Sequence, residues 1–207
     1  MRNAVSLSQP QYVQGSRFDA IIKHIVGIEG GFNDIRQDKG GATKYGISLR
    51  FLKDEGKIDA NRDGFKDFDL DFDGDIDGQD VRRLTPVMAK NLYFECFWKR
   101  YNMDRLPFPI DGAVLDQAIN GGGVAAVKCL QRALNDLPLG FKVTEDGILG
   151  PMTSDAVSMA QSAFGRKLID RYRVQVANRY RAIVAADKSQ KIFLNGWLRR
   201  ASELGNV

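Results

Sequence analysis

The stretch RFDAIIKHIVGIEGG, residues 17–31, decides how the N-terminal part of the chain folds. Its apolar residues recur at the spacing of one helix face, at Phe18, Ile21, Ile22, Ile25 and Ile28. Ser16 is a suitable N-cap for this helix. Glycine is the usual helix terminator, so we expect the helix to end at Gly30-Gly31, with Glu29 at its C-terminal end.

The rest of the chain extends this helical reading. Residues 32–48 are Gly-rich and polar and read as loop or short strand, and residues 49–57 read as a short helix. Thr85-Pro86 is a helix start, with Thr as N-cap and Pro in the first turn. Further helices are predicted over 114–119, 124–134, 153–163, 164–186 and 192–204. Because strand signals are sparse, the predicted fold class is all-α.

Composition sets the outer limits of function. The chain has 207 residues, 43% of them hydrophobic and 27% charged, which is typical of a globular protein. No stretch approaches the roughly 20 apolar residues of a membrane helix, and the N-terminus lacks the apolar core of a secretory signal. Cys96 and Cys129 have neither metal-ligand nor disulfide-framework spacing, so we expect small buried side chains.

The overall charge of +4 combines two unlike parts. Residues 59–80 contain nine Asp residues against Arg62 and Lys66, a local charge of −7, which leaves +11 on the rest of the chain. The C-terminal segment 166–207 is itself basic, with ten Lys or Arg and three acidic residues. A basic body with an acidic segment predicts two different electrostatic partners.

The acidic segment is an internal repeat of ten residues, DANRDGFKDF (59–68) followed by DLDFDGDIDG (69–78). Oxygen ligands at alternate positions, with Gly at the sixth, are the pattern of a calcium-binding loop. The second loop is complete and supplies Asp69, Asp71, Asp73, Asp75 (through its carbonyl), Asp77 and Asp80. The first supplies Asp59, Asn61, Asp63 and Asp67 but has Leu70 at its twelfth position. We therefore predict one structural Ca²⁺, or two if the first loop borrows Asp69 or Asp71; the alternative is a solvated acidic loop.

Glu29 is the candidate acid. A carboxyl group at the end of an apolar helix, flanked by glycines that admit a large substrate, can protonate a glycosidic oxygen. Asp38 could activate a water or stabilise an oxocarbenium-like transition state, and Thr43 could orient that water. The alternative for Glu29 is an ordinary solvent-facing residue at a helix end.

The block from Glu29 to Ser48 carries a family resemblance. Its EGG and its later DKGGATKYGI, residues 38–47, resemble the signature of glycoside hydrolase family 108, the N-acetylmuramidases of phage and prophage endolysins. Residues 115–153 and 193–200, including Leu115-Asp116, Asp146-Gly147-Ile148 and Gly196-Trp197-Leu198, resemble the peptidoglycan-binding region that accompanies this family. The resemblance implies that Glu29 is the catalytic acid; the roles of Asp38 and Thr43 follow by analogy with other lysozymes.

The resemblance also implies an architecture. Residues 1–110 would form a lysozyme-like lobe with the calcium loop inserted at 59–80, packed on a helical peptidoglycan-binding lobe of residues 111–207. Tyr45, Gln117 and Asn120 are candidate substrate-binding residues. Trp98, Tyr101 and Trp197 could stack on sugar rings or pack in the core. His24 is the only histidine, which excludes a zinc site built on histidine clusters.

These observations predict a peptidoglycan hydrolase that cleaves β-1,4 bonds between N-acetylmuramic acid and N-acetylglucosamine. The expected protein is a monomer that binds bacterial peptidoglycan, does not bind nucleic acid and does not insert stably into a membrane. As an endolysin it would be made in the bacterial cytoplasm and act at the cell wall after release. Two alternatives stay open: a non-enzymatic, calcium-stabilised wall-binding protein, and a secretion or assembly factor that opens the wall locally.

Overall fold

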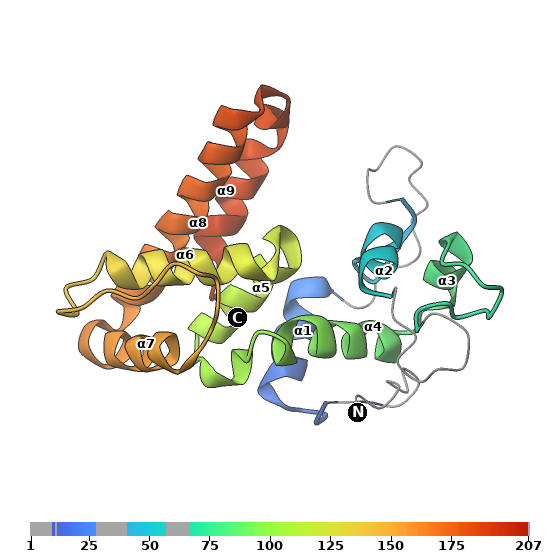
Figure 1. Ribbon diagram of the computed structural model, residues 1–207, viewed down its shortest axis with the longest axis horizontal. Coiled ribbons are helices and arrows are strands. Elements are labelled where there is room, and N and C mark those ends of the chain that lie inside the picture. The colour runs from blue at the N-terminus through green and yellow to red at the C-terminus, as the bar shows by residue number, and fades with distance from the viewer. Residues whose placement is uncertain (1–9, 11, 28–40, 57–66, 207) are drawn as a thin grey trace. The chain divides into compact units, whose positions relative to one another are not determined.

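A computed structural model describes residues 10, 12–27, 41–56 and 67–206 (Figure 1). The described residues are mainly helical, as predicted, and their one sheet has two short strands. The chain divides into two compact units, Met1–Cys96 and Phe97–Val207. This division falls before the boundary at 110/111 that the sequence suggested. No helix among the described residues is both long and apolar enough to span a membrane.

The first unit contains four α-helices and the small sheet among its described residues. Its elements are α1 (Arg17–Val26), β1 (Thr43–Lys44), β2 (Ile47–Ser48), α2 (Leu49–Glu55), α3 (Gly78–Arg83) and α4 (Pro86–Tyr93). A π-helical segment, η1 (Phe94–Lys99), follows α4 directly. The predicted N-caps are confirmed, since Ser16 accepts from Asp19 N–H at 3.3 Å and Thr85 accepts from Met88 N–H at 3.3 Å.

The end of α1 corrects the sequence reading. The helix stops at Val26, and Gly27 takes the left-handed conformation at φ 53° while its N–H bonds to the Lys23 carbonyl. Gly27 is therefore the terminator that was expected at Gly30-Gly31, because it is the first residue on the helix that adopts positive φ without strain. Residues 28–40, which include Glu29 and Asp38, lie outside the described residues.

A buried ion pair joins α1 to α4 in the core of the first unit. The Asp19 carboxylate accepts from Lys90 Nζ at 2.7 Å and from Lys23 Nζ at 2.9 Å, and it also accepts from Gly15 N–H. Only 5% of the Asp19 side chain and 12% of the Lys90 side chain are exposed. Burial by itself raises the pKa of Asp19, but the hydrogen bonds from Lys90 and Lys23 outweigh it and lower this pKa to about 2.

Replacing Asp19 by Asn is expected to lower the free energy of unfolding by about 2–3 kcal/mol at pH 7, because Lys90 is left without its counter-charge. The folded pKa lies below the unfolded value of 3.8, so the contribution is complete above pH 4 and is lost as pH falls toward 2. Urea unfolding should therefore show a smaller difference in unfolding free energy between the wild type and Asp19→Asn at pH 3 than at pH 7. Asp54→Asn, at a largely exposed pair with Arg50, serves as the control; a difference that stays constant with pH would contradict the prediction.

The second unit is a helical assembly. Its elements are η2 (Met103–Arg105), α5 (Ile110–Gly121), α6 (Gly123–Asn135), α7 (Pro151–Phe164), α8 (Arg166–Ala186), η3 (Lys188–Phe193) and α9 (Leu194–Glu203). Helix α6 packs against α5 and α8, and α9 lies along α8 (Figure 1). The predicted break at residues 121–123 is confirmed, with Gly122 between α5 and α6 at φ 89°.

Helix α5 is deeply buried in this unit. Ile110, Ala113, Val114 and Leu115 are fully buried, and α5 contacts both α6 and α8. Cys129 on α6 and Cys96 in the first unit are both buried and form no disulfide among the described residues, which confirms the expectation of small core side chains. The core of the second unit thus needs α5 as much as the helices that follow it.

The turn at Asp146-Gly147 is held against α6 by the side chain of Gln131. The Gln131 side chain donates to Asp146 Oδ1 at 2.7 Å and accepts from Gly147 N–H at 2.9 Å. Asp146 Oδ1 also accepts from Ile148 N–H at 2.8 Å. The turn therefore holds the connection between α6 and α7 in place.

Candidate functional site

The hairpin β1–β2 carries the described part of the Glu29–Ser48 block. Thr43 pairs with Ser48, and Lys44 pairs with Ile47. The two turn residues between them both have positive φ, 52° at Tyr45 and 76° at Gly46. Two successive positive φ angles define a tight hairpin turn, in which glycine at the second position is favoured. Backbone geometry therefore explains the glycine at position 46 of the block.

Tyr93 of α4 locks this turn in place. Its hydroxyl donates to the Tyr45 carbonyl at 3.1 Å, and burial raises the pKa of this phenol well above 10. Gly46 sits directly against the same hydroxyl, because a Cβ at position 46 would lie 2.6 Å from Tyr93 Oη and 3.3 Å from Val26 Cγ1. The hairpin, α1 and α4 thus fix one another at this point.

Replacing Gly46 by Ala is expected to lower the free energy of unfolding by about 2 kcal/mol or more, through positive-φ strain and the collision with Tyr93. Chemical denaturation of the single variants and of Gly46→Ala combined with Tyr93→Phe measures the two terms. The cost of Gly46→Ala should be smaller in the Tyr93→Phe background, where the colliding hydroxyl is gone. Gly27 also has positive φ, but no described atom lies within 4 Å of its Cβ position, so Gly27→Ala controls for strain alone. Equal costs of Gly46→Ala in both backgrounds would rule out the collision.

The structure places two of the four predicted residues of this block. Thr43 is half-buried on β1, where its hydroxyl donates to the Gly41 carbonyl at 3.3 Å. Tyr45 is half-buried at the turn, and Lys44 Nζ lies 5.4 Å from the centre of its ring. Both side chains therefore lie on the same hairpin. Glu29 and Asp38 are outside the described residues.

The described part of the acidic loop, residues 67–80, gathers its carboxylates into two groups. Oxygen atoms of Asp69, Asp71 and Asp73 lie within 4.8 Å of one another, and so do those of Asp75, Asp77 and Asp80. Asp59, Asn61 and Asp63 lie outside the described residues, whereas Asp67 is half-buried at the start of this part.

Backbone N–H groups hold the two most buried carboxylates of the loop. Asp69 accepts from Asp73 N–H at 3.2 Å and from Gly74 N–H at 2.8 Å, with Gly74 at φ 99°. Asp80 accepts from Leu70 N–H and from Asp77 N–H, each at 2.6 Å, and so joins the start of the loop to the start of α3. These bonds preset the positions of the first and last predicted ligands.

The burial of the Asp71 carboxylate is only partly compensated by its neighbours. Only 13% of its side chain is exposed. Its Oδ1 is buried and has no hydrogen-bond partner among the described residues. Its other oxygen lies 3.5 Å from Nε of the largely exposed Arg83. Desolvation raises the pKa of Asp71, and repulsion from Asp73 and Asp80 raises it further. An orphaned carboxylate oxygen among other carboxylates fits an oxygen-seeking cation such as Ca²⁺.

The remaining predicted substrate residues, Gln117 and Asn120, lie on α5 in the second unit. Gln117 is buried, and its carbonyl oxygen accepts from Tyr180 Oη at 2.8 Å. Asn120 is exposed, with its amide bonded to the carbonyl and the side chain of Asp116. Asn120 lines a pocket, whereas Gln117 is outside the lining and is bonded to Tyr180, which is part of it.

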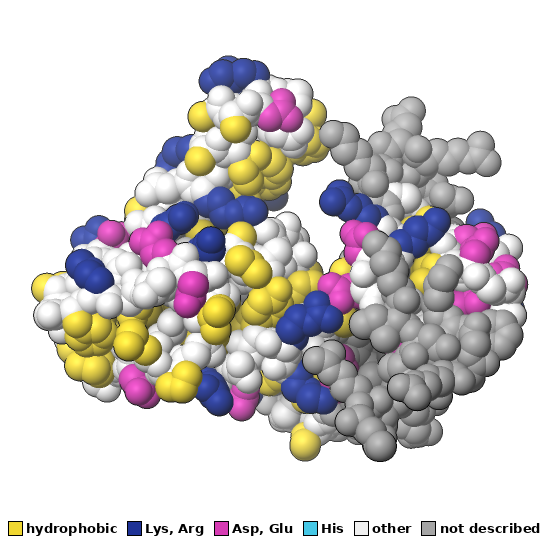
Figure 2. All heavy atoms as spheres, in the orientation of Figure 1, with side chains coloured by type: hydrophobic (Ala, Val, Ile, Leu, Met, Phe, Trp, Pro, Cys, Tyr) yellow, Lys and Arg dark blue, Asp and Glu magenta, His cyan; other side chains and the backbone are white. Residues whose placement is uncertain are grey.

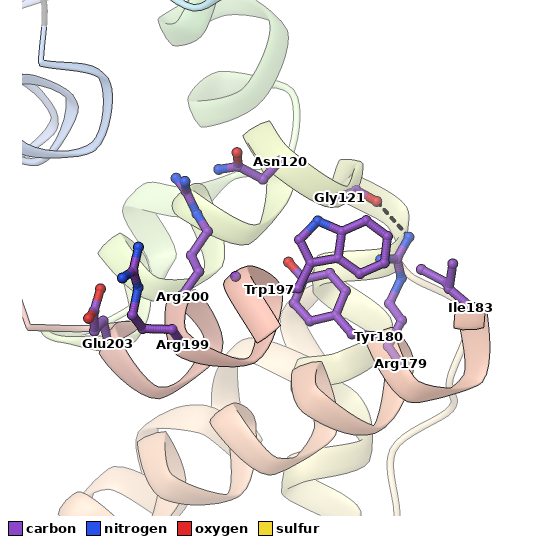
Figure 3. Close-up of a pocket in the computed structure, with 10 residues that line it drawn as sticks. Asn120, Gly121, Arg179, Tyr180, Ile183, Trp197, Arg199, Arg200 and Glu203 are labelled. Atoms are coloured by element: carbon purple, nitrogen blue, oxygen red, sulfur yellow. Dashed lines mark hydrogen bonds between the residues drawn. The ribbon is translucent and has the colours of Figure 1, made fainter. Parts of the chain in front are cut away.

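The sequence did not predict this pocket as a site. The pocket has a volume of about 580 Å³ and lies where the end of α5 meets α8 and α9 (Figure 3). Its lining includes Arg179, Tyr180, Trp197, Arg199 and Arg200. Of these five, the sequence indicates only Trp197, as a candidate for stacking on sugar rings. The other four are not recognisable as one site from the sequence, because they become neighbours only when α8 and α9 pack together. On the face shown in Figure 2, basic and hydrophobic side chains are interspersed over this helix pair.

Comparison with known proteins supplies the class. Residues 22–122 match the family described as Glycosyl hydrolase 108, and residues 125–202 match the family described as Predicted Peptidoglycan domain. The pairing defines a glycoside hydrolase that acts on peptidoglycan. The chain belongs to the glycosyl hydrolase 108 family through residues 22–122, with a peptidoglycan domain after them.

A solved structure agrees with this assignment over nearly the whole chain. The structure of Brucella abortus SagA has 28% sequence identity and a TM-score of 0.67, and the match covers 94% of both chains. No curated protein matches the chain. The family match extends through the end of α5, which the structure places in the second unit.

Proposed function

We propose that this glycoside hydrolase is an N-acetylmuramidase, which cleaves the β-1,4 bond from N-acetylmuramic acid to N-acetylglucosamine. The observation that carries the proposal is the family match over residues 22–122, which includes Glu29, Asp38 and the hairpin. The peptidoglycan domain over residues 125–202 supports the same polymer as substrate.

In the proposed mechanism Glu29 donates a proton to the glycosidic oxygen as the bond to the sugar breaks. Positive charge develops at the anomeric carbon, where the Asp38 carboxylate would stabilise it or activate the attacking water. The Thr43 hydroxyl is suited to orient that water, because the hairpin holds it on a strand that Tyr93 fixes through the adjoining turn. Tyr45, on the same hairpin, would contact the glycan.

Identifying the new reducing end tests the bond assignment. Purified peptidoglycan is digested, the products are reduced with borohydride, and the reduced sugars are identified by mass spectrometry. Muramitol is expected, because a muramidase leaves N-acetylmuramic acid at the reducing end. Glucosaminitol would show that the enzyme is a glucosaminidase. No new reducing end, together with retained binding to insoluble peptidoglycan, would favour a non-enzymatic wall-binding protein.

We further propose that the acidic loop binds Ca²⁺ as a structural ion, one ion with a second if residues 59–67 contribute. The orphaned Asp71 oxygen, the two close carboxylate groups and the preset Asp69 and Asp80 support a cation with oxygen ligands. When bound, the ion neutralises repulsion that the loop would otherwise carry, and its role is to stabilise the fold.

The cellular role that we propose is cell-wall lysis, as by a phage or prophage endolysin made in the cytoplasm and released to the wall. The +11 charge outside residues 59–80 supports attraction to an anionic envelope. We propose that the enzyme acts as a monomer. Sedimentation of the purified protein measures that state, and lysis of cells with a permeabilised inner membrane measures the role.

A further inference from the structure

The pocket between α5, α8 and α9 combines an aromatic surface with a group of cations (Figure 3). Tyr180 and Trp197 stack with ring centres 5.2 Å apart and an interplanar angle of 29°. Phe193 stacks on Trp197 at 5.7 Å and 24°, and 49% of Phe193 is exposed. The stack thus continues from the buried Tyr180 to a ring at the surface. Flat apolar rings of this kind bind the apolar faces of sugars.

Three arginines and one acidic residue line the same pocket. Arg179 Nη2 donates to the Gly121 carbonyl at 2.9 Å, and Arg200 Nε pairs with Asp116 Oδ1 at 2.7 Å. A guanidinium group carries several N–H donors, so one such bond leaves other donors that can bind a ligand. Arg199 is exposed on α9. Glu203 is the one carboxylate in the lining, so the lining is cationic overall.

A buried glutamine, Gln117, packs behind the aromatic stack and holds Tyr180. Gln117 is 1% exposed, and its amide nitrogen has no hydrogen-bond partner among the described residues, although its oxygen is bonded to Tyr180. A Cβ at Gly121 would collide with that nitrogen and would lie 3.2 Å from Arg179 Nη1. The missing side chain at Gly121 therefore lets the Gln117 amide and the Arg179 guanidinium approach this residue closely. Because this nitrogen is inaccessible and Gln117 is not in the lining, Gln117 supports Tyr180 and is not itself a contact for the ligand.

We infer that this pocket binds a carboxylate group of a peptidoglycan fragment, with the aromatic stack holding the attached sugar. Guanidinium groups are the preferred partners of carboxylates, since they offer paired N–H donors. Peptidoglycan carries such carboxylates on its stem peptides, and on the lactyl group of muramic acid where the peptide is absent. The inference rests on peptidoglycan as the partner and is independent of which glycosidic bond the enzyme cleaves.

Binding is tested on the full chain with three small probes. The first is the disaccharide N-acetylglucosaminyl-N-acetylmuramic acid carrying its stem peptide, the second is the same disaccharide without peptide, and the third is N,N′-diacetylchitobiose. The first two lack the bond that a muramidase cleaves, so the wild-type protein can be used. Chitobiose has the same type of ring but no carboxylate. Affinities are measured by isothermal titration calorimetry.

The chain has two tryptophans, Trp98 and Trp197, which give the experiment an internal control. Trp98 is buried, whereas Trp197 lines the pocket. In a two-dimensional ¹H–¹⁵N spectrum the indole signal of Trp197 should move when the carboxylate-bearing fragment binds, and that of Trp98 should not. Tighter binding of the peptide-bearing fragment would assign the stem peptide as the source; tighter binding of the peptide-free disaccharide would assign the lactyl group, whose carboxylate is free only in that probe.

The matched variants are Arg199→Gln and Arg181→Gln. Both arginines are exposed, and Arg181 lies on α8 outside the pocket, where its guanidinium donates to Asn178 on the same helix. Arg199→Gln should weaken the carboxylate-bearing fragment about tenfold, as for the loss of one charge-assisted hydrogen bond, and Arg199→Lys should restore part of the affinity. Arg181→Gln should bind as the wild type does.

Three results would overturn the inference. One is chitobiose binding as tightly as the two carboxylate-bearing probes. Another is equal weakening by Arg199→Gln and Arg181→Gln, which would indicate attraction by overall charge. The last is a Trp197 signal that stays in place while calorimetry records binding elsewhere. Circular dichroism of each variant excludes a loss of fold as the cause of weaker binding.

Discussion

Replacing Glu29 by Gln is expected to reduce the rate of reducing-end release from peptidoglycan by at least about 100-fold. The glutamine side chain has nearly the same size but has no acidic proton to give to the departing glycosidic oxygen. General acid catalysis contributes about 10²–10⁴ to such rates, so the loss should appear in the turnover number. Binding of the variant to insoluble peptidoglycan should remain, because the second unit is untouched.

The carboxylate of Glu55, at the end of α2, offers a matched control in the same unit. Glu55→Gln makes the same chemical change and should keep full activity. Asp38→Asn and Thr43→Ala test the assisting roles, and we expect each to lower the rate. A Glu29→Gln variant that retains wild-type turnover would remove Glu29 as the acid, and the carboxylate whose loss abolishes the activity would replace it.

Removing Ca²⁺ is expected to lower the melting temperature on the order of 10 °C. At 1 mM Ca²⁺ and a dissociation constant of about 1 µM, binding to the folded state adds about 4 kcal/mol. For a protein of this size, each kcal/mol of unfolding free energy shifts the melting temperature by several degrees. Scanning calorimetry with 1 mM Ca²⁺ and with EDTA measures the difference. Equal melting temperatures would contradict the calcium assignment.

Asp71→Asn makes the calcium prediction sharper because its effect should reverse sign. In EDTA the substitution removes a desolvated charge that faces Asp73 and Asp80, so the variant should melt at or above the wild type. In Ca²⁺ it removes a charged ligand, so the variant should melt below the wild type and gain little from the ion. Asp54→Asn, on α2, should respond to Ca²⁺ as the wild type does. A destabilising effect of Asp71→Asn in EDTA as well would point to a purely structural role for its bond to Arg83.

Much of the fold is predictable because its signals are local. Ser16 and Thr85 cap their helices through bonds that span three residues, and the break at Gly122 needs only its own positive φ. The predicted end of α1 is too late because the sequence has several glycines there, at 27, 30 and 31, and each can terminate a helix. Propensity alone does not decide which one does.

The site is predictable only where its residues are close in the sequence. The hairpin block and the acidic repeat each lie within about twenty residues, so their spacing carries the chemistry. The pairing of Asp19 with Lys90 and the pocket formed by Gly121, Arg179 and Trp197 depend on how distant helices pack. The hydrophobic periodicity of the sequence does not predict such contacts. The hydrogen bond from Tyr93 to the hairpin turn is not predictable for the same reason, because the sequence indicates only that Tyr93 is a core residue.

The position of α5 has a consequence for how this enzyme can be divided. The glycosyl hydrolase match ends just after α5, yet α5 is buried against α6 and α8 of the second unit. A fragment cut at the family boundary would expose the apolar side of α5 to water and take a central piece from the remaining helices. The catalytic and wall-binding parts are therefore unsuited to exchange as interchangeable cassettes at residue 122. A chimaeric peptidoglycan hydrolase would need its splice point upstream of Ile110, so that α5 stays with the helices it packs against.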